Sequence, residues 1–300
     1  MEIRQLRTFR TVARLLSFNR AAEQLHYAQS SISAQIQALE EELGVPLFDR
    51  LGRGILLTEA GTRLMHYAEK ILDLADETRS EVVGTRELTG SLTIKIPETL
   101  GVHRFPAVIK QFRSRFPKVR LNFTSCTHEG LQKDLRKGIT DLAFLLAESI
   151  QAADLAAEVL GVETLVLVAH PGHRLAAQPV VRAQDLKGET ILFSKVDCSY
   201  RRSLESILDI ENIRYDATLE FNSVAAIKQC VMTGVGITIL PEITVAEDIS
   251  QGRLAALSWS EGTLEVASLM IWYRDRWLSP TLSAFMEIVR EVFNATCERI

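Results

Sequence analysis

The sequence of 300 residues predicts an α/β protein with an all-α N-terminal part. Residues 1–43 contain neither glycine nor proline, and only Pro46 precedes Pro97, so helix-breaking residues are rare over about the first 90 positions. After residue 90 the pattern changes to alternating and continuous apolar runs, which are typical of strands. Helical stretches separate these runs, and alternation of strand and helix indicates an α/β body.

Composition and charge exclude several classes of protein. Apolar residues make up 47% of the chain, and 34 basic against 38 acidic residues give a formal net charge of −4. These values argue against disorder and against a protein that coats nucleic acid. The apolar runs, such as 165–169, are far shorter than the roughly 18 residues of a membrane helix, and the N-terminus shows no apolar signal segment. Four cysteines without a CxxC pair favour a reduced, cytoplasmic location.

Three helices are expected before residue 44. Apolar residues at positions 6, 9, 12, 13 and 16 form one face of the first helix. Asn19 is the expected N-cap of the second helix, 20–25, and Gly44 is expected to end the third, 29–43.

The third helix carries the candidate base contacts. Opposite its apolar stripe it presents short polar side chains, namely Gln29, Ser30, Ser31, Ser33 and Gln35. Glutamine can pair with adenine through two hydrogen bonds, and a helix N-terminus attracts phosphate, so this face suits the major groove of double-stranded DNA. The alternative is that these residues are only solvated surface.

The segment 46–58 strengthens the DNA-binding interpretation. It is expected to form a tight hairpin with Arg50 and Arg53 at its tip. A hairpin after such helices is the wing of a winged helix-turn-helix, and its arginines would contact the DNA backbone or the minor groove.

A long helix is predicted next, at 59–87, with Thr58 as its N-cap and a length of about 40 Å. Apolar positions recur along it at spacings of three and four, as in a coiled-coil seam: Leu64, Tyr67, Ile71, Leu74 and Thr78. The stripe could pack on its own domain. No neighbouring segment is left to cover so long a helix, however, so self-pairing into a dimer is the stronger expectation.

These N-terminal patterns resemble one family closely. Residues 3–66 are similar to the N-terminal domain of LysR-type transcriptional regulators. The match comprises Leu6-x-x-Phe9, Ser17-Phe18-x-x-Ala21-Ala22-x-x-Leu25, Ser33-x-x-Ile36-x-x-Leu39-Glu40-x-x-Leu43-Gly44-x-x-Leu47-Phe48-x-Arg50 and Leu57-Thr58-x-Ala60-Gly61. Ser30 and Ala34 depart from the proline and the basic residue that the family often has there, which leaves the operator sequence open.

The resemblance implies a domain organisation. It gives a winged helix-turn-helix DNA-binding domain at 1–58, a linker and dimerisation helix at 59–90, and an effector-binding domain at 91–300. That last domain would have a periplasmic-binding-protein-like fold, with lobe one at about 91–161 and 267–300 and lobe two at about 162–266. The implied protein is a sequence-specific transcriptional regulator that forms a homodimer and then a homotetramer, with RNA polymerase as a candidate partner.

A small-molecule effector would bind between the two lobes and control this regulator. The family commonly holds its effector with a serine or threonine in the loop after the first strand, where Thr99 lies. The candidate effector contacts are Thr99, Leu100, Thr127, Ser199, Arg201 and Arg202. Two arginines at a helix start favour a carboxylate, although both could be merely solvated and the neighbouring Glu98 could favour an amine.

Other functions find little support in the sequence. No GxSxG, GxxxxGK[ST], HExxH or GxGxxG motif is present, so no enzyme and no cofactor is expected. His170 and His173 lie in a Pro-Gly turn and predict no metal site, while Cys126 and Cys198 are expected to be inert rather than redox-active. A solute-binding transport protein would explain residues 91–300 but not the winged helix.

Overall fold

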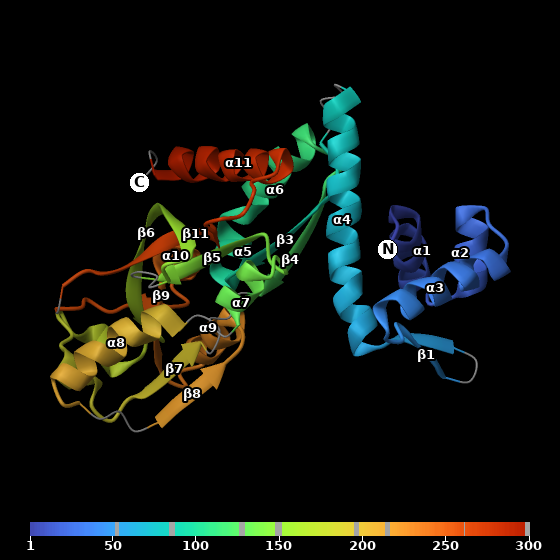
Figure 1. Cartoon of the computed structure of the whole chain (residues 1–300). Helices are drawn as coiled ribbons and strands as arrows, with labels where there is room; N and C mark the ends of the chain where they lie inside the picture. Colours follow the sequence, from blue (N-terminus) through green and yellow to red (C-terminus); the bar gives the residue numbers. More distant parts are fainter. Residues whose placement is uncertain are drawn as a thin grey trace. The chain divides into compact units, whose positions relative to one another are not determined.

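The computed structural model describes residues 1–51, 54–83, 88–125, 130–147, 152–194, 198–213, 217–260 and 262–297 (Figure 1). The chain divides into two compact units. The first comprises Met1–Ser91 with Phe116–Arg120, and the second comprises Leu92–Arg115 with Leu121–Ile300. Among the described helices, none is long and apolar enough to cross a membrane.

The first unit contains the predicted helices and hairpin. Its elements are α1 (Ile3–Leu15), α2 (Phe18–Leu25), α3 (Gln29–Leu43), β1 (Phe48–Leu51), β2 (Gly54–Leu57) and α4 (Glu59–Val83). β1 and β2 pair antiparallel, from Phe48 opposite Leu57 to Leu51 opposite Gly54. The core lies between the helices, and its fully buried members include Phe9, Ile32 and Leu39.

The helix ends confirm two of the expected caps and correct a third. Gly44 follows α3 with φ +68°, and Thr58 Oγ1 accepts a hydrogen bond from Gly61 N at 2.9 Å. The prediction that Asn19 caps α2 was wrong. The helix begins two residues earlier, at Phe18, because Ser17 is extended and its Oγ accepts from Arg20 N at 3.3 Å.

The start of α4 is fastened to the segment that enters the hairpin. Thr58 N donates to Leu47 O at 3.0 Å, and Thr58 Oγ1 donates to Pro46 O at 2.8 Å. A Cβ atom on Gly61 would lie 2.1 Å from the Leu47 carbonyl oxygen. Only glycine therefore permits this close approach, which gives a physical reason for Gly61 in the sequence match.

α4 is partly covered by its own unit, contrary to the expectation that no segment is left to cover it. Ala68 and Leu72 are fully buried, and ion pairs join α1 to α4 through Arg14–Glu69 at 2.6 Å and Arg7–Asp76 at 3.3 Å. Within the predicted seam, Leu64 and Ile71 pack against this core. Tyr67, Leu74 and Thr78 are exposed instead, so the face open to a partner is narrower than the sequence indicated.

The second unit is an α/β body built on a series of hydrogen-bonded strands. The first elements are β3 (Ser91–Ile96), α5 (Glu98–His103), α6 (Phe105–Arg115), β4 (Arg120–Ser125), α7 (Leu131–Arg136), β5 (Leu142–Ala147) and β6 (Leu155–Ala169). The later elements are the turns η1 (Arg174–Ala177) and η2 (Ala183–Leu186), followed by β7 (Thr190–Ser194), α8 (Cys198–Ile210), β8 (Ala217–Phe221), α9 (Val224–Met232), β9 (Ile237–Pro241), α10 (Glu242–Ser250), β10 (Ala255–Ala256), β11 (Leu264–Tyr273) and α11 (Pro280–Cys297).

Two long strands join the two halves of this body. The described strands follow the order β4-β3-β5-β11-β6-β9-β7-β8, with β10 beside β6. β6 and β11 pair antiparallel along their lengths, β5 pairs with β11, and β9 pairs with β6. We call the part around β3–β5 lobe one and the part around β7–β9 lobe two. Because β6 and β11 belong to both lobes, the lobe boundaries near 161 and 267 stay predictions.

Candidate functional site

The exposed face of α3 lies where the sequence predicted it. Gln29, Ser30 and Ser31 are exposed at its first turn, while Ile32 and Ile36 are buried on the opposite side. Gln29 Nε2 donates to the half-buried Ser33 Oγ at 2.8 Å, so these two side chains form a polar pair on the surface.

Gln35 differs from the other four candidate base contacts. It is half-buried, and its Oε1 accepts a hydrogen bond from Oγ1 of the buried Thr8 at 2.8 Å. Gln35 lies three residues after Ile32 and four before Leu39, so the helical period places it beside the apolar stripe. Its amide therefore joins α3 to α1, and the exposed candidate contacts are the residues of the first turn.

The N-terminus of α3 is open in a way that the N-terminus of α2 is not. Ser17 caps α2, whereas the N-cap of α3 is Ala28, which offers no side-chain hydrogen bond. The first N–H groups of a helix have no partner inside the helix, and together with the helix dipole they attract phosphate. The start of α3 is thus free to meet an external anion.

Glu40 holds the hairpin against the helices, a role that the sequence analysis missed. Its Oε1 accepts from Leu47 N at 2.6 Å and from Phe48 N at 3.2 Å. The Phe48 ring lies 5.4 Å from the ring of Phe9 and 5.8 Å from that of Phe18, measured between centroids. The base of the wing is therefore bound to the helical core by hydrogen bonds and ring contacts. The side chain of Arg50 and the whole of Arg53 lie outside the described residues.

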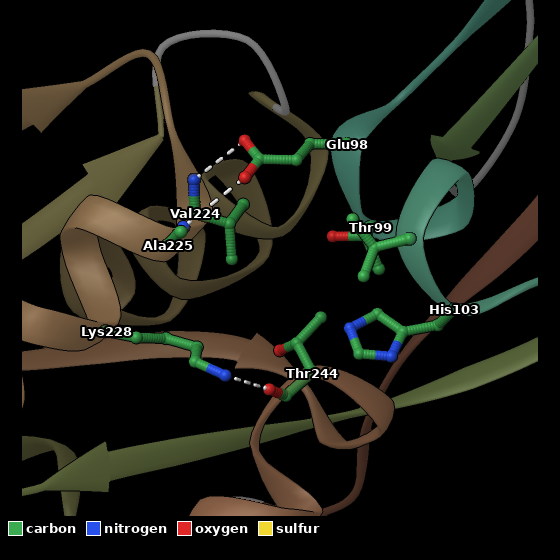
Figure 2. Close-up of a pocket in the computed structure, with 8 residues that line it drawn as sticks. Glu98, Thr99, His103, Val224, Ala225, Lys228 and Thr244 are labelled. Carbon is green, nitrogen blue, oxygen red and sulfur yellow. Dashed lines mark hydrogen bonds between the residues drawn. The ribbon is translucent and has the colours of Figure 1, made fainter.

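A pocket lies in the second unit between α5 of lobe one and α9 and α10 of lobe two (Figure 2). Its volume is about 130 Å³. The lining residues are Glu98, Thr99, Val102 and His103 of α5, Val224, Ala225 and Lys228 of α9, and Thr244 of α10.

Thr99 brings an unsatisfied hydroxyl to this pocket. The residue is only 1% exposed, and among the described residues its Oγ1 has no hydrogen-bond partner. Figure 2 shows this oxygen directed from α5 toward α9. A buried hydroxyl without a partner is unfavourable by about 1–3 kcal/mol, so a ligand that accepts or donates here gains that energy.

Glu98 reaches across the pocket to lobe two. Its Oε2 accepts from Val224 N at 2.9 Å, and its Oε1 accepts from Ala225 N at 3.4 Å (Figure 2). Ser223 Oγ also donates to Oε1 at 3.3 Å. The carboxylate of one lobe thus binds the helix N-terminus of the other.

The cationic side of the pocket is Lys228. Its Nζ donates to Thr244 O at 2.8 Å and lies 2.5 Å from Asp248 Oδ2. His103 faces the same pocket, and partial burial lowers the pKa of its imidazole, with further lowering by the positive charges of Lys228 and Arg104. His103 is therefore neutral at pH 7, and the cation that lines the pocket is Lys228, whose charge Asp248 partly balances.

Arg104 fixes the end of α5 on the shared strand β6. Its guanidinium binds both carboxylate oxygens of Glu163, at 2.9 and 3.2 Å, and the two side chains are 11% and 8% exposed. A two-point bond of this kind orients as well as attracts. The end of the helix that carries Glu98 and Thr99 is consequently fixed to the strand that both lobes share.

Three further candidate effector contacts, Leu100, Arg201 and Arg202, do not line this pocket. Leu100 is fully buried in lobe one. Arg201 binds Glu205 at 2.7 Å and Glu220 at 2.5 Å, and these bonds, that of Glu220 first, raise the pKa of its guanidinium. Its charge is therefore already neutralised, which corrects the expectation that it is open to a ligand. Arg202 is exposed and does not line the pocket.

Some predicted positions cannot be placed. Thr127 and Cys126 lie outside the described residues, as do the side chains of Ser199 and Cys198. No group of His, Cys, Asp and Glu suited to a metal ion occurs in the part of the chain that the structure describes. The sequence analysis missed His103, Lys228 and Thr244, because no motif marks them and only the folded chain brings them beside Thr99.

The two units define a class of protein, a regulator that joins a helix-turn-helix to a ligand-binding body. Comparison with known proteins agrees. Residues 3–62 match the model of the bacterial regulatory helix-turn-helix protein, lysR family, and residues 85–294 match that of the LysR substrate binding domain. The chain therefore belongs to the LysR-type transcriptional regulators, which bind DNA and small-molecule effectors, form oligomers and are not enzymes.

Relatives and solved structures cover the full length. The helix-turn-helix-type regulator YwqM of Bacillus subtilis is 41% identical over 98% of this chain and 100% of its own, and GltR of the same organism is 34% identical over 98% and 97%. The structure of CbnR complexed with its target DNA is 25% identical, with a TM-score of 0.67 over 97% of this chain and 100% of that one.

Proposed function

We propose that the effector of this regulator is a small carboxylate that binds in the pocket between α5, α9 and α10. The proposal rests on one observation, the buried and unpartnered Thr99 hydroxyl beside a helix N-terminus. The ammonium group of Lys228, on the same helix, also lines the pocket, although Asp248 already balances part of its charge. Donors of these kinds complement a carboxylate group.

The cavity volume limits the part of the ligand that is enclosed. A cavity of about 150 Å³ holds benzene, so a cavity of about 130 Å³ encloses a group of similar or smaller size. This favours a short organic acid, or the acid end of a longer molecule. An amine is the competing class, but Glu98, the acid that would bind it, already accepts three hydrogen bonds.

The ligand would act by shifting a population. Its pocket is lined from both lobes, so it binds one arrangement of the lobes more tightly than another. A ligand with equal affinity for both arrangements would shift nothing. The measurable consequence is that the operator affinity of the regulator changes when the acid is added.

A thermal-shift screen of small acids, amines and amino acids tests the proposal. Thr99→Val keeps the shape but removes the hydroxyl, and we expect the stabilising acid to bind this variant about ten- to a hundredfold more weakly. Thr140→Val is the matched control, because Thr140 is also buried with an unpartnered hydroxyl but does not line the pocket. An amine as the hit, or equal binding by wild type and Thr99→Val, would contradict the proposal.

We further propose that the protein dimerises through the exposed stripe of α4, defined by Tyr67, Leu74 and Thr78, and that dimers associate into tetramers. Tyr67 and Leu74 are 43% and 47% exposed, and they are spaced one heptad apart, as in the seam of a coiled coil. Leu74→Asp should dissociate the dimer, measured by light scattering at low concentration. Thr62→Asp is the control, since Thr62 is exposed on another side of the helix. An unchanged mass for Leu74→Asp would place the interface elsewhere.

We place the regulator in the cytoplasm, with RNA polymerase as its partner at promoters, and we assign base contacts to Gln29, Ser30, Ser31 and Ser33 and phosphate contacts to Arg50 and Arg53. A gel shift with DNA from upstream of its own gene tests the DNA contacts. Arg53→Ala should weaken binding to all sequences alike and reduce the salt dependence by about one phosphate contact.

A further inference from the structure

One hydrogen-bond cluster links residues that are more than a hundred positions apart in the sequence. Glu98 begins α5 in lobe one, while its carboxylate binds Val224 N, Ala225 N and Ser223 Oγ at the start of α9 in lobe two. Ser223 is already the N-cap of α9, because its Oγ accepts from Ala226 N at 3.4 Å. The helix thus has its own serine cap, and in addition the carboxylate of Glu98 binds the N–H groups of Val224 and Ala225.

The geometry is that of a bound anion. The first N–H groups of a helix are a preferred site for a carboxylate, because they point outward unpaired and carry the positive end of the dipole. Here an acid of the protein itself occupies that site. Lys228 lies one turn further along α9 and lines the same pocket, with its ammonium group paired to Asp248.

A second observation shows that this site is built for more than Glu98. The Thr99 hydroxyl is 1% exposed, has no partner among the described residues, and is directed toward α9 (Figure 2). Glu98 leaves it unsatisfied. A ligand that reached the start of α9 from within the pocket would give Thr99 the partner that it lacks.

We infer that Glu98 is an internal ligand that occupies the carboxylate subsite at the start of α9, and that an effector carboxylate binds by displacing it. The inference rests on the proposed carboxylate function and adds how that site is regulated. Glu98 holds the two lobes together when no effector is present. The effector takes over the N–H groups of Val224 and Ala225 and releases this contact.

The competition predicts how affinity responds to mutation. An effector that must displace Glu98 binds with an apparent affinity reduced by the fraction of molecules in which the subsite is free. Removing Glu98 should therefore tighten the binding of a carboxylate about tenfold, where removal of an ordinary contact would weaken it. An amine that binds Glu98 directly would instead bind more weakly once Glu98 is removed.

Acetate is a suitable probe because it carries the carboxylate and little else. In the full-length protein, Glu98→Ala vacates the subsite, and we expect 100 mM sodium acetate to raise its Tm by about 2–4 °C relative to 100 mM sodium chloride. Wild type should show a much smaller difference between the two salts. Equal acetate shifts in wild type and Glu98→Ala would overturn the inference.

Two further variants keep the test decisive. Glu242→Ala removes an exposed carboxylate from the first turn of the neighbouring helix α10, and it should respond to acetate as wild type does. Glu98→Gln retains size and an acceptor but loses the charge, so its acetate shift should lie between those of wild type and Glu98→Ala. If Glu98→Ala does not fold, an acetate shift of Glu98→Gln no larger than that of wild type overturns the inference.

The outcomes separate this inference from the proposed function. In one outcome, acetate raises the Tm of Glu98→Ala, and the effector binds Thr99→Val as tightly as wild type. This outcome would support Glu98 as an internal ligand and would remove Thr99 from the effector site. An effector that requires Thr99 but binds wild type and Glu98→Ala equally would support the pocket and overturn the role of Glu98.

Discussion

Two glutamates in this chain use the same chemistry in different settings. Glu40 accepts hydrogen bonds from the consecutive N–H groups of Leu47 and Phe48, and Glu98 accepts them from the consecutive N–H groups of Val224 and Ala225. Glu40 reaches only seven and eight residues along the chain, within one closely packed core. Glu98 reaches 126 and 127 residues along the chain, from one lobe to the other.

The difference teaches how context decides what a hydrogen bond does. Around Glu40 the aromatic rings of Phe9, Phe18 and Phe48 hold the same junction, so the carboxylate is one fastening among several. Around Glu98 the pocket leaves room for another molecule and an unpaired hydroxyl beside it. The first bond is therefore structural, and the second can be exchanged for a ligand.

The largest expected effect is that of Glu40→Ala. It leaves two partly buried N–H groups without their charged acceptor, which should lower the stability of the first unit by about 3 kcal/mol. We expect its thermal transition to fall by roughly 12 °C or more, with a parallel loss of DNA affinity. Glu41→Ala is the control, because Glu41 is exposed and its side chain accepts a hydrogen bond from Gln37 on the surface of the same helix. Equal changes in Tm for the two variants would mean that the hydrogen bonds of Glu40 do not stabilise the first unit.

A second variant makes the start of α3 resemble the start of α9. Ala28→Asp should supply the missing cap and stabilise the helix by about 1 kcal/mol, yet place a negative charge where we expect DNA phosphate. We predict a higher Tm together with DNA affinity reduced about tenfold, measured by fluorescence anisotropy. Ala28→Ser supplies a cap without charge and should lose much less affinity. If Ala28→Asp binds DNA as wild type does, the start of α3 does not meet phosphate.

The smallest expected effect is the pH response of His103. Burial lowers the pKa of its imidazole in the folded protein, as do Lys228 and Arg104, so folding disfavours the protonated form. The stability contributed by the neutral ring is fully present above the unfolded pKa of about 6.5, and it is lost as the pH falls through the folded pKa.

His103→Gln should therefore show a slightly smaller fall in Tm between pH 8 and pH 5 than wild type does, as measured by calorimetry. The effect is small because the residue is largely exposed, and solvent screens its charge. A steeper fall for the variant would contradict the stated direction of the pKa shift.

The local features of the first unit could be read from the chain because their causes are local. Helix α3 ends at Gly44, which adopts a positive φ, and Thr58 caps α4 from a neighbouring position. The cap of α2 was misplaced by two residues because both Ser17 and Asn19 are good caps, and only the backbone conformation chooses between them. Gln35 was assigned to the DNA surface although its helical period already placed it beside Ile32 and Leu39.

The pocket could be predicted only in part. Thr99 followed from the family resemblance, and it does line a pocket with residues of both lobes. Arg201 was chosen for its charge at a helix start, but Glu205 and Glu220 neutralise that charge. The residues near Glu220 in the sequence do not predict its ion pair with Arg201, because an ion pair depends on distance in space.

The sequence by itself determined which segments form helices or strands, their order and the family. Periodicity, caps and spaced motifs depend on residues that are close together in the chain. The tertiary structure alone decided that α1 covers one face of α4 and that Glu98 meets the start of α9. The physical reason is that these contacts join segments far apart in the chain. Their energies depend on burial and orientation, which exist only after the strands and helices have packed.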